Sequence, residues 1–328
     1  MTIRLRGPVA AVAAAVAIAT LLAACSSGVY AETQLPTVTS TPSSAPSSSG
    51  TATAAPVTCD NATQSYDPLP SLTGDAANNA VAAIRNSPNQ KLRVGVSADS
   101  LLLGSRNPLT GQIEGFDIDM AKAVAKAIFG DENKIELIVI STADRIAALQ
   151  EKRVDMVVRA MTMTCARWQQ IAFSSQYYQA GVKILVKKDD PTTSLAGLAG
   201  KKVCAATSST SQTAVQSTPG VIPVLAATHT GCLVLFQSGD VDAIASDDTI
   251  LAGLVAQDPY AKVPPMQALT SEPYGIGVNK DQKDLVRYVN RVLDTVKADG
   301  RWKASYDKWF LPNLKVEAQP PQPLYGRG

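Results

Sequence analysis

The segment LQEKRVDMVV at residues 149–158 combines a helix end, a polar turn and a short apolar strand. The segment FQSGDVDAIA at residues 236–245 repeats the same pattern. Two such helix–turn–strand units, far apart in the chain, predict two lobes, each built on its own α/β sheet.

Strands and helices alternate around the first unit. The sequence predicts strands at 92–96, 134–140 and 154–158, and helices at 116–129 and 144–150. In the longer helix Met120, Val124 and Ile128 recur at every fourth position, and Gly130 follows where a C-cap belongs. Short connections between alternating elements predict an open, mostly parallel sheet.

The alternation begins again after Asp189-Asp190-Pro191. It predicts strands at 202–206, 221–225 and 241–245, a helix start at 211–216 and a helix at 230–238. The C-terminal part is helical, with an apolar stripe from Leu285 to Val296 and an aromatic one from Trp302 to Phe310, which we assign to the core.

The N-terminus has the features of a secretory signal. Arg4 and Arg6 precede an apolar run over residues 8–24, and Leu22-Ala23-Ala24 leads directly into Cys25. Small residues followed by cysteine resemble the bacterial lipobox, in which the cysteine is acylated after cleavage. We therefore expect residues 1–24 to be removed and Cys25 to anchor the protein by lipid on the outer face of a cell membrane. An ordinary signal peptide that holds a cysteine is the alternative.

Residues 25–56 are rich in Pro, Ser, Thr and Ala and lack the apolar periodicity of a core, so we expect a disordered tether. An N-terminal arm at 57–89 follows, and globular structure is expected to start near Lys91. After the signal, no apolar run reaches the roughly 18 residues that span a bilayer.

The charge balance indicates no nucleic-acid partner. The chain has 30 Lys and Arg against 28 Asp and Glu, and removal of residues 1–24 takes away only Arg4 and Arg6, which leaves 28 of each. A neutral mature chain has no basic excess with which to bind a polyanion.

Four cysteines are left once Cys25 is assigned to lipid: Cys59, Cys165, Cys204 and Cys232. An even number outside the cell predicts two disulfides, with three possible pairings. We favour Cys204 with Cys232, which would join a strand to the following helix, and Cys59 with Cys165, which would hold the arm to the first lobe. Buried free thiols are the alternative. No two cysteines have C-x-x-C spacing, which argues against a metal site.

The sequence carries no enzyme signature and no cofactor motif. It lacks G-x-S-x-G, H-E-x-x-H and the phosphate-binding G-x-x-x-x-G-K-[ST], and His229 is its only histidine. We expect His229 to be a surface or packing residue, and the protein to be a non-enzyme without cofactor or metal. Composition alone leaves carboxylate chemistry open.

Polar residues gather where the predicted strands end, which is where ligands of open α/β sheets bind. Strand 154–158 runs into Arg159 and then reaches Arg167 on a short helix for which Thr164 is a plausible N-cap. An arginine can hold a carboxylate through two parallel hydrogen bonds.

The second lobe shows the same arrangement with other side chains. Thr207-Ser208-Ser209-Thr210 follows strand 202–206, and Asp247-Asp248 follows strand 241–245. An aspartate there suits an ammonium group. Arginines in one lobe and an acid in the other predict a cleft that closes on an amino acid.

A series of motifs runs through the chain in order: VGV (94–96), GFDIDMAKAVA (115–125), DRIAALQEKRVDMVV (144–158), MTMTCARWQQIAFSSQYY (161–178), GKKVCAATSST (200–210), GDVDAIASD (239–247) and YGIGV (274–278). Together they resemble the family 3 extracellular solute-binding proteins that serve polar amino-acid ABC transporters, over roughly Leu92 to Phe310. The paired cysteines and the segments RNPLTGQIEGFDID and SDDTILAGL resemble the actinobacterial branch that handles glutamate, glutamine or aspartate.

The resemblance implies an α/β, two-lobed periplasmic-binding-protein-like fold of type II, with a hinge of two crossovers near Tyr178 and Tyr274. It implies lobe 1 at 90–179 and 275–314, lobe 2 at 180–274, and a C-terminal tail at 315–328.

The resemblance also implies that both lobes hold the ligand's α-groups. Arg167 would clamp the α-carboxylate with the help of Thr162, Ser209 and Thr210. The α-ammonium would be received by Asp247, Thr162 and the carbonyl of Ala160.

For the ligand's side chain the implied reader is Arg159, which would bind the second carboxylate of an acidic ligand; a solvated arginine at a strand end is the alternative. Arg106 is a weaker candidate, and Asp99 lies near a family ligand position. Leu101 to Leu103 and Thr142 stand where many relatives place aromatic residues, which fits a short acidic ligand better than lysine or arginine.

The implied function is a monomeric receptor, anchored by lipid on the extracellular or periplasmic face, that captures glutamate or aspartate in a closing cleft and presents it to an ABC permease. Capture of glutamine or asparagine is an alternative, and so is service to a membrane nutrient sensor. A remote alternative is an enzyme similar to the periplasmic dehydratases, against which the ammonium-binding Asp247 argues.

Overall fold

The structure is a computed structural model that describes residues 57–328. The expected signal peptide, the lipidated Cys25 and the tether at 25–56 lie outside the described residues. Within residues 57–328 no helix has the length and apolar character needed to cross a membrane.

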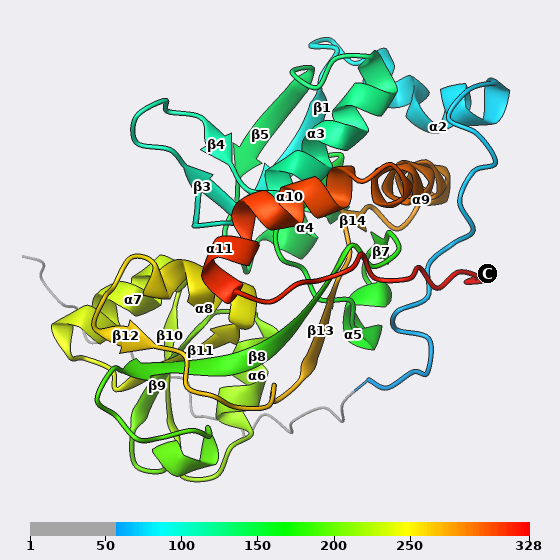
Figure 1. The fold of residues 1–328 in the computed structure, drawn as a ribbon. Helices are drawn as coiled ribbons and strands as arrows, with labels where there is room; N and C mark the ends of the chain where they lie inside the picture. The colour runs from blue at the N-terminus through cyan, green and yellow to red at the C-terminus, as the bar shows by residue number, and fades with distance from the viewer. Residues whose placement is uncertain (1–56) are drawn as a thin grey trace, which may run out of the picture. The chain divides into compact units, whose positions relative to one another are not determined.

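Helices and strands alternate along the described chain (Figure 1). The helices are α2 (Asp75–Arg85), α3 (Phe116–Phe129), α4 (Arg145–Gln150), α5 (Cys165–Trp168), α6 (Thr210–Gln216), α7 (His229–Ser238), α8 (Asp248–Val255), α9 (Lys283–Ala298), α10 (Arg301–Trp309) and α11 (Leu311–Leu314), with a 3₁₀ turn at Ala196–Leu198. The strands are β1 (Leu92–Val96), β2 (Asp99–Ser100), β3 (Gly104–Arg106), β4 (Ile113–Glu114), β5 (Ile135–Val139), β6 (Met156–Val157), β7 (Ala172–Phe173), β8 (Tyr178–Lys187), β9 (Lys202–Ala206), β10 (Ile222–Ala226), β11 (Ala243–Asp247), β12 (Ala261–Lys262), β13 (Ser271–Tyr274) and β14 (Gly277–Val278). The predicted helix 116–129 and the strands 92–96 and 202–206 are confirmed at both ends, and the other predicted strands differ by one or two residues at each end.

The first lobe is built on a five-stranded sheet in the order β5-β1-β6-β14-β7. β1 pairs in parallel with β5 and β6, as predicted. β14 returns from the C-terminal part of the chain and pairs antiparallel with β6 and β7. Helices α3, α9 and α10 pack against one another on this lobe.

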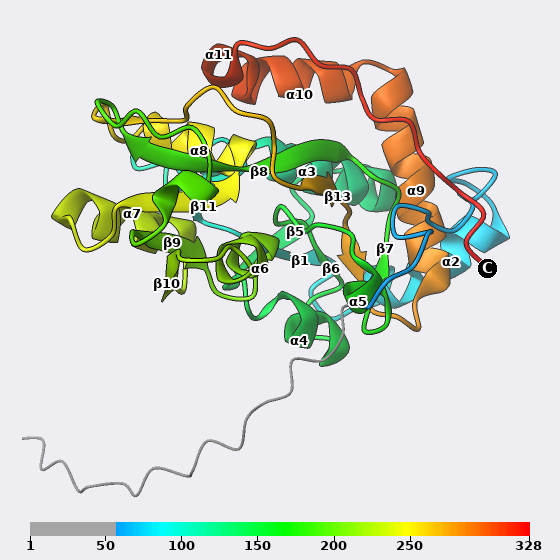
Figure 2. The same cartoon turned by 90° about the horizontal axis from the view of Figure 1, so that it is seen from below.

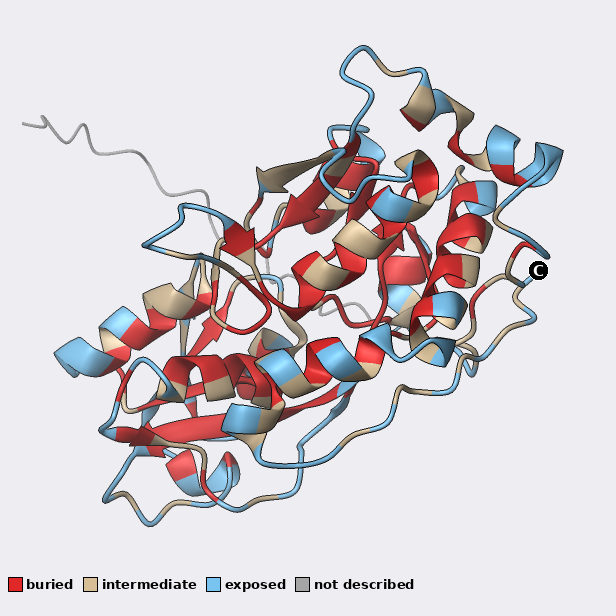
Figure 3. Cartoon of the chain, turned by 45° about the horizontal axis from the view of Figure 1, so that its top comes forward, coloured by how far each residue is buried: buried red, intermediate tan, exposed pale blue. Residues whose placement is uncertain are grey.

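The second lobe is a mixed sheet in the order β10-β9-β11-β8-β12 that is covered on both faces. Alternate residues of a strand point to opposite faces, so Val203 and Ala205 join one apolar cluster while Cys204 joins another. Helix α6 supplies Val215 to the first cluster, and α7 supplies Cys232 to the second. The buried residues of both lobes lie on the sheets and on the helix faces turned toward them (Figure 3).

Two strands cross between the lobes side by side. β8 and β13 pair antiparallel, with Tyr178 opposite Tyr274 at the end nearer the first lobe (Figure 1). Tyr274 also forms an isolated bridge with Thr162 of the first lobe. The two-lobed fold with two crossovers is thus confirmed, although β8 itself was not predicted as a strand. The exact lobe boundaries stay a prediction.

The N-terminal arm is part of the first lobe, so the expected start of globular structure near Lys91 is wrong. Leu69 and Val81 are buried, and α2 packs on α9. The C-terminal tail runs along α9 toward the arm (Figure 2), where Gln64 pairs with Leu324. In α2 Ala77, Val81 and Ile84 lie on one helix face. This apolar pattern was not recognised as a helix in the sequence.

Candidate functional site

A polar pocket lies between the two lobes. Its walls are Thr142, Arg145, Ala160, Thr162 and Arg167 from the first lobe and Ser209, Thr210, Ser211, His229, Asp247 and Ile250 from the second. Six of the nine ligand-binding residues expected from the sequence line it. The cavity left between these walls is about 10 Å³, roughly the room of one water molecule, so the two lobes lie nearly in contact around it.

Arg167 is positioned by the predicted cap of α5. The Thr164 hydroxyl accepts a hydrogen bond from the backbone N–H of Arg167 at 3.2 Å, which starts the helix at the pocket wall. The Arg167 guanidinium donates to the carbonyl of Thr162 at 2.7 Å and, across the lobes, to the carbonyl of Ser208 at 3.2 Å. Burial lowers the pKa of Arg167, and the nearby Glu272 opposes this.

Arg145 is a second arginine of the pocket, and it was not predicted from the sequence. It is the first residue of α4 and is buried. Its guanidinium donates to the carbonyls of Thr142 at 2.9 Å, Ala160 at 3.2 Å and Ser208 at 3.4 Å. A cation in the first turn of a helix opposes the helix dipole, and that mismatch is a signal that could have identified Arg145.

Two buried carboxylates lie at the pocket: Asp247 lines it, and Glu272 contacts two of its threonines. Asp247 ends β11, and its Oδ2 accepts a hydrogen bond from the Tyr274 hydroxyl at 2.5 Å. Burial raises the pKa of Asp247 to about 7, with a further contribution from Glu272. Glu272, on the crossover strand β13, is 1% exposed and was also missed from the sequence.

Glu272 fixes the hydroxyl groups of two pocket threonines. Its Oε2 accepts from Thr162 Oγ1 at 2.5 Å and from Thr210 Oγ1 at 2.7 Å. A hydroxyl has one hydrogen to donate, so each threonine oxygen is left as an acceptor. Acceptors suit an ammonium group, which favours Thr210 as an ammonium ligand instead of the carboxylate ligand expected from the sequence.

Three expected residues do not line the pocket. Arg159 lies behind its wall, with its guanidinium donating to the Ile140 carbonyl at 3.0 Å and to Thr142 Oγ1 at 2.7 Å. Arg106 is exposed on the β3–β4 hairpin and donates to the Gly111 carbonyl at 2.7 Å. This contact joins residues five positions apart in the same hairpin, outside the pocket.

Asp99 makes a contact between the lobes instead of lining the pocket. Its carboxylate accepts hydrogen bonds from Ser97 of the first lobe at 2.7 Å and from Thr230 of α7 in the second lobe. Hydrogen bonds from Thr230 and Ser97 outweigh burial and lower the pKa of Asp99.

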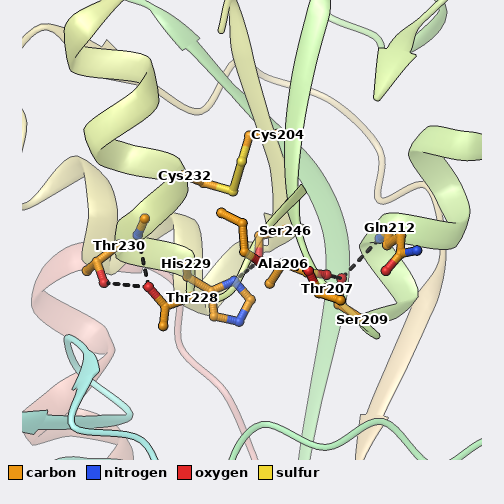
Figure 4. Close-up of a disulfide and its surroundings, with 12 residues drawn as sticks. Cys204, Ala206, Thr207, Ser209, Gln212, Thr228, His229, Thr230, Cys232 and Ser246 are labelled. Atoms are coloured by element: carbon orange, nitrogen blue, oxygen red, sulfur yellow. Dashed lines mark hydrogen bonds between the residues drawn. A yellow bond between two sulfur atoms is a disulfide. The ribbon is translucent and has the colours of Figure 1, made fainter. Parts of the chain in front are cut away.

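Of the two expected places for His229, the surface is wrong and the buried, packed one is confirmed. It is buried, lines the pocket, and its Nδ1 lies 3.3 Å from Ser246 Oγ (Figure 4).

Both favoured disulfides are present. Cys204–Cys232 lies next to His229 and joins α7 to β9, and Cys59–Cys165 joins the N-terminal arm to α5. In the described part of the chain, no cluster of His, Cys, Asp or Glu side chains is arranged to hold a metal ion.

Residues 92–312 match the family described as bacterial extracellular solute-binding proteins, family 3. The chain is 36% identical over 238 residues to the glutamine-binding protein of an ABC transporter from Bacillus subtilis, covering 72% of this chain and 86% of that one. It is 30% identical over 251 residues to a glutamate-binding protein from Corynebacterium efficiens, covering 73% and 83%.

Solved structures of binding proteins share the fold. An ancestral arginine-binding protein bound to glutamine is 36% identical, with a TM-score of 0.63, covering 67% of this chain and 97% of that one. A solute receptor for L-cysteine from Neisseria gonorrhoeae is 27% identical, with a TM-score of 0.68, covering 72% and 96%. The chain therefore belongs to family 3 of the bacterial extracellular solute-binding proteins, which are receptors and not enzymes.

Proposed function

We propose that this protein captures an acidic amino acid, glutamate or aspartate, between its lobes and presents it to an ABC permease. The observation that carries the proposal is the pair of buried arginines, Arg145 and Arg167, in a pocket whose other wall holds Asp247. Arg167 takes the α-carboxylate and Asp247 the α-ammonium. Arg145 is then left for a second carboxylate, in the role that the sequence had assigned to Arg159.

Closure of the lobes completes the site. Both arginines donate to the carbonyl of Ser208 in the opposite lobe, so in this arrangement the first-lobe charges contact the second lobe. A ligand that binds both walls shifts the population toward this closed form. Charge pairs inside the closed cleft are stronger than in water.

The proposed place of action is the outer face of the membrane. A lipid anchor on Cys25 would hold the receptor, as a monomer, beside its permease. The relatives named above support this partner, because the Bacillus protein belongs to an ABC transporter.

Glutamine is the second candidate ligand. A glutamine-binding protein from Geobacillus stearothermophilus is 39% identical over 196 residues, covering 59% of this chain and 74% of that one. In addition, Glu272 brings a second buried carboxylate close to Arg167. Two arginines and two carboxylates would balance, which favours a ligand with a neutral side chain.

Calorimetric titration distinguishes the two candidates. The purified protein is unfolded and refolded to remove carried ligand, and then titrated with glutamate, aspartate, glutamine and asparagine. We expect the acids to bind at least tenfold more tightly than their amides. Preference for the amides would select glutamine or asparagine, and no heat with any of the four would overturn the proposal.

A further inference from the structure

Helix α5 carries Arg167 but is too short to hold its own position. It contains only the four residues Cys165–Trp168. An isolated helix needs about 12–15 residues to form in water, so a single turn depends on contacts with the rest of the fold. The Thr164 cap fixes the first backbone N–H groups, and further contacts hold both ends of α5.

The N-terminal arm runs beside α5 and contacts both of its ends (Figure 2). Cys165, the first residue of the helix, forms the disulfide with Cys59. Trp168, the last residue, donates from its indole N–H to the carbonyl of Ala62 at 2.7 Å, and its ring meets Tyr66 edge to face with the ring centres 6.1 Å apart. The arm is thus joined to the first and the last residue of the helix.

A cation from the C-terminal tail lies over the ring of Trp168. The guanidinium carbon of Arg327 is 3.8 Å from the ring centre, which is a cation–π arrangement. Arg327 Nε also donates to the carbonyl of Gln64 at 2.9 Å, and the backbone N–H of Arg327 donates to the carbonyl of Ser65 at 3.0 Å. The tail therefore contacts the arm and the helix at the same time.

We call the arm residues 59–66 and the tail residues 324–327 the brace. The brace is itself fixed to the first lobe. Ser65 is buried, and its hydroxyl donates to the carbonyl of Phe173 in β7 at 2.8 Å. The side chain of Asn290 in α9 donates to the carbonyl of Tyr66 at 2.7 Å. Because the brace is attached to β7 and α9, it can resist a movement of α5.

The brace lies outside the part of the chain that matches the family. The match covers residues 92–312, and all residues of the pocket walls are within it. The brace contacts come from residues before 92 and after 312. Both of its segments converge on the helix that carries Arg167.

We propose that the brace positions Arg167 for the α-carboxylate of the ligand, with Trp168 and Arg327 as positioning residues, neither of which lines the pocket. Arg167 lies between the two braced ends of α5, and its guanidinium reaches the carbonyl of Ser208 in the second lobe. Rigid support of the helix preorganises the carboxylate contact, since less binding energy is spent on ordering it. The inference rests on the proposed function, which assigns Arg167 to the α-carboxylate.

Two variants of the full chain weaken the brace by different routes. Arg327→Met keeps the length of the side chain and removes the cation from the indole ring. The double variant Cys59→Ser with Cys165→Ser removes the disulfide and leaves no free thiol at either position. Tyr325→Phe is the matched control, because its hydroxyl donates to an aspartate of α9 at 2.6 Å, a tail contact that does not involve α5.

Calorimetric titration compares glutamate with its α-amide, which lacks the charged α-carboxylate. We expect glutamate to bind about tenfold more weakly to the double variant and about threefold more weakly to Arg327→Met. Binding of the α-amide should stay within about twofold, and the control should match the wild type with both ligands. Equal losses for glutamate and the α-amide, or no loss for glutamate, would overturn the inference. If glutamine binds more tightly than glutamate, glutamine and its own α-amide form the pair.

Hydrogen exchange of the ligand-free protein gives a readout that needs no ligand. We expect the backbone amides of α5 to exchange about fivefold faster or more in the double variant. The amides of α4, which carries Arg145 on the same wall, should exchange as in the wild type. Unchanged exchange at α5, or equal acceleration at α4 and α5, would overturn the inference.

The outcomes separate this inference from the proposed function. Tight binding of glutamate or glutamine with equal losses for its α-amide overturns the role of the brace alone. Failure of every amino acid to bind the wild-type protein overturns the proposed function, and the exchange measurement then decides whether the brace holds α5. The exchange measurement also decides if the α-amide binds too weakly to titrate. If the double variant does not fold, as judged by its melting curve, exchange is measured on Arg327→Met.

Discussion

The two walls of the pocket differ in charge and in how their charge is held. On the first-lobe wall Arg145 and Arg167 each donate to a backbone carbonyl of their own lobe, at Thr142 and Thr162. On the second-lobe wall the charge is Asp247, whose carboxylate accepts from Tyr274 on the crossover strand.

Because of this difference, the two walls respond differently to a ligand. Arginine stays charged even when it is buried, so the first wall presents a permanent positive charge. Asp247, with its pKa raised to about 7, is partly protonated in the ligand-free protein. The second wall therefore gains its full charge only when an ammonium group arrives.

Removal of a first-wall charge should have the largest effect on ligand binding. Arg167→Ala leaves the ligand's α-carboxylate buried without its partner, which costs about 3–5 kcal/mol, or roughly a thousandfold in affinity. Calorimetric titration measures the loss, and circular dichroism checks the fold. Binding within tenfold of the wild type would contradict the assignment of Arg167.

Arg145 tests whether the same wall also reads the side chain. Arg145→Met keeps much of the volume, and we expect glutamate to bind about 30-fold more weakly, since a charge-assisted hydrogen bond is lost, and alanine to change less. Arg106→Met is the matched control, because that arginine is exposed on its hairpin. An equal loss for glutamate and alanine would place Arg145 outside the side-chain contact.

The second wall is tested by pH. Because the pKa of Asp247 is raised to about 7 in the folded protein, the ligand-free protein holds a proton that the unfolded chain loses near pH 4. This contribution to stability is present at low pH and is lost as the pH rises through 7.

Ligand binding has the opposite dependence on pH. An ammonium group needs ionised Asp247, so affinity should rise by up to tenfold per pH unit below 7 and level off above it. Titrations in buffers of different ionisation enthalpy should show proton release, and Asp247→Asn should abolish it. Equal apparent enthalpies in all buffers at pH 6.5 would contradict the raised pKa.

A contact between the lobes outside the pocket gives the smallest expected effect. Asp99 of the first lobe accepts from Thr230 of the second, a bond that we expect to break when the lobes separate. Thr230→Val should weaken ligand binding roughly fivefold, by about 1 kcal/mol, and leave the melting temperature of the ligand-free protein unchanged. Unaltered affinity would show that the contact does not favour closure.

What the sequence could predict was local. The i, i+4 pattern of Met120, Val124 and Ile128 identified α3, and the Thr164 cap placed Arg167 at a pocket wall. These features depend on residues that are neighbours in the chain, so periodicity and capping rules can predict them.

What the sequence could not predict depended on tertiary direction. Arg159 lies two residues after β6, but its side chain turns toward Ile140 and Thr142, behind the wall. Arg145 reaches the pocket from a helix start, and Glu272 contacts two pocket threonines from a crossover strand, so only the folded structure brings them together. His229 was expected to be a surface or packing residue, because it is the only histidine of the chain and forms no motif with another.

A crystal structure of the protein with bound glutamate would test directly whether the first wall binds the carboxylates and the second wall the ammonium group. We expect the α-carboxylate within about 3 Å of the Arg167 guanidinium, the ammonium against Asp247 and the oxygens of Thr162 and Thr210, and the side-chain carboxylate against Arg145. A glutamate bound in the reverse direction, with its ammonium away from Asp247, would contradict the division of labour between the two walls.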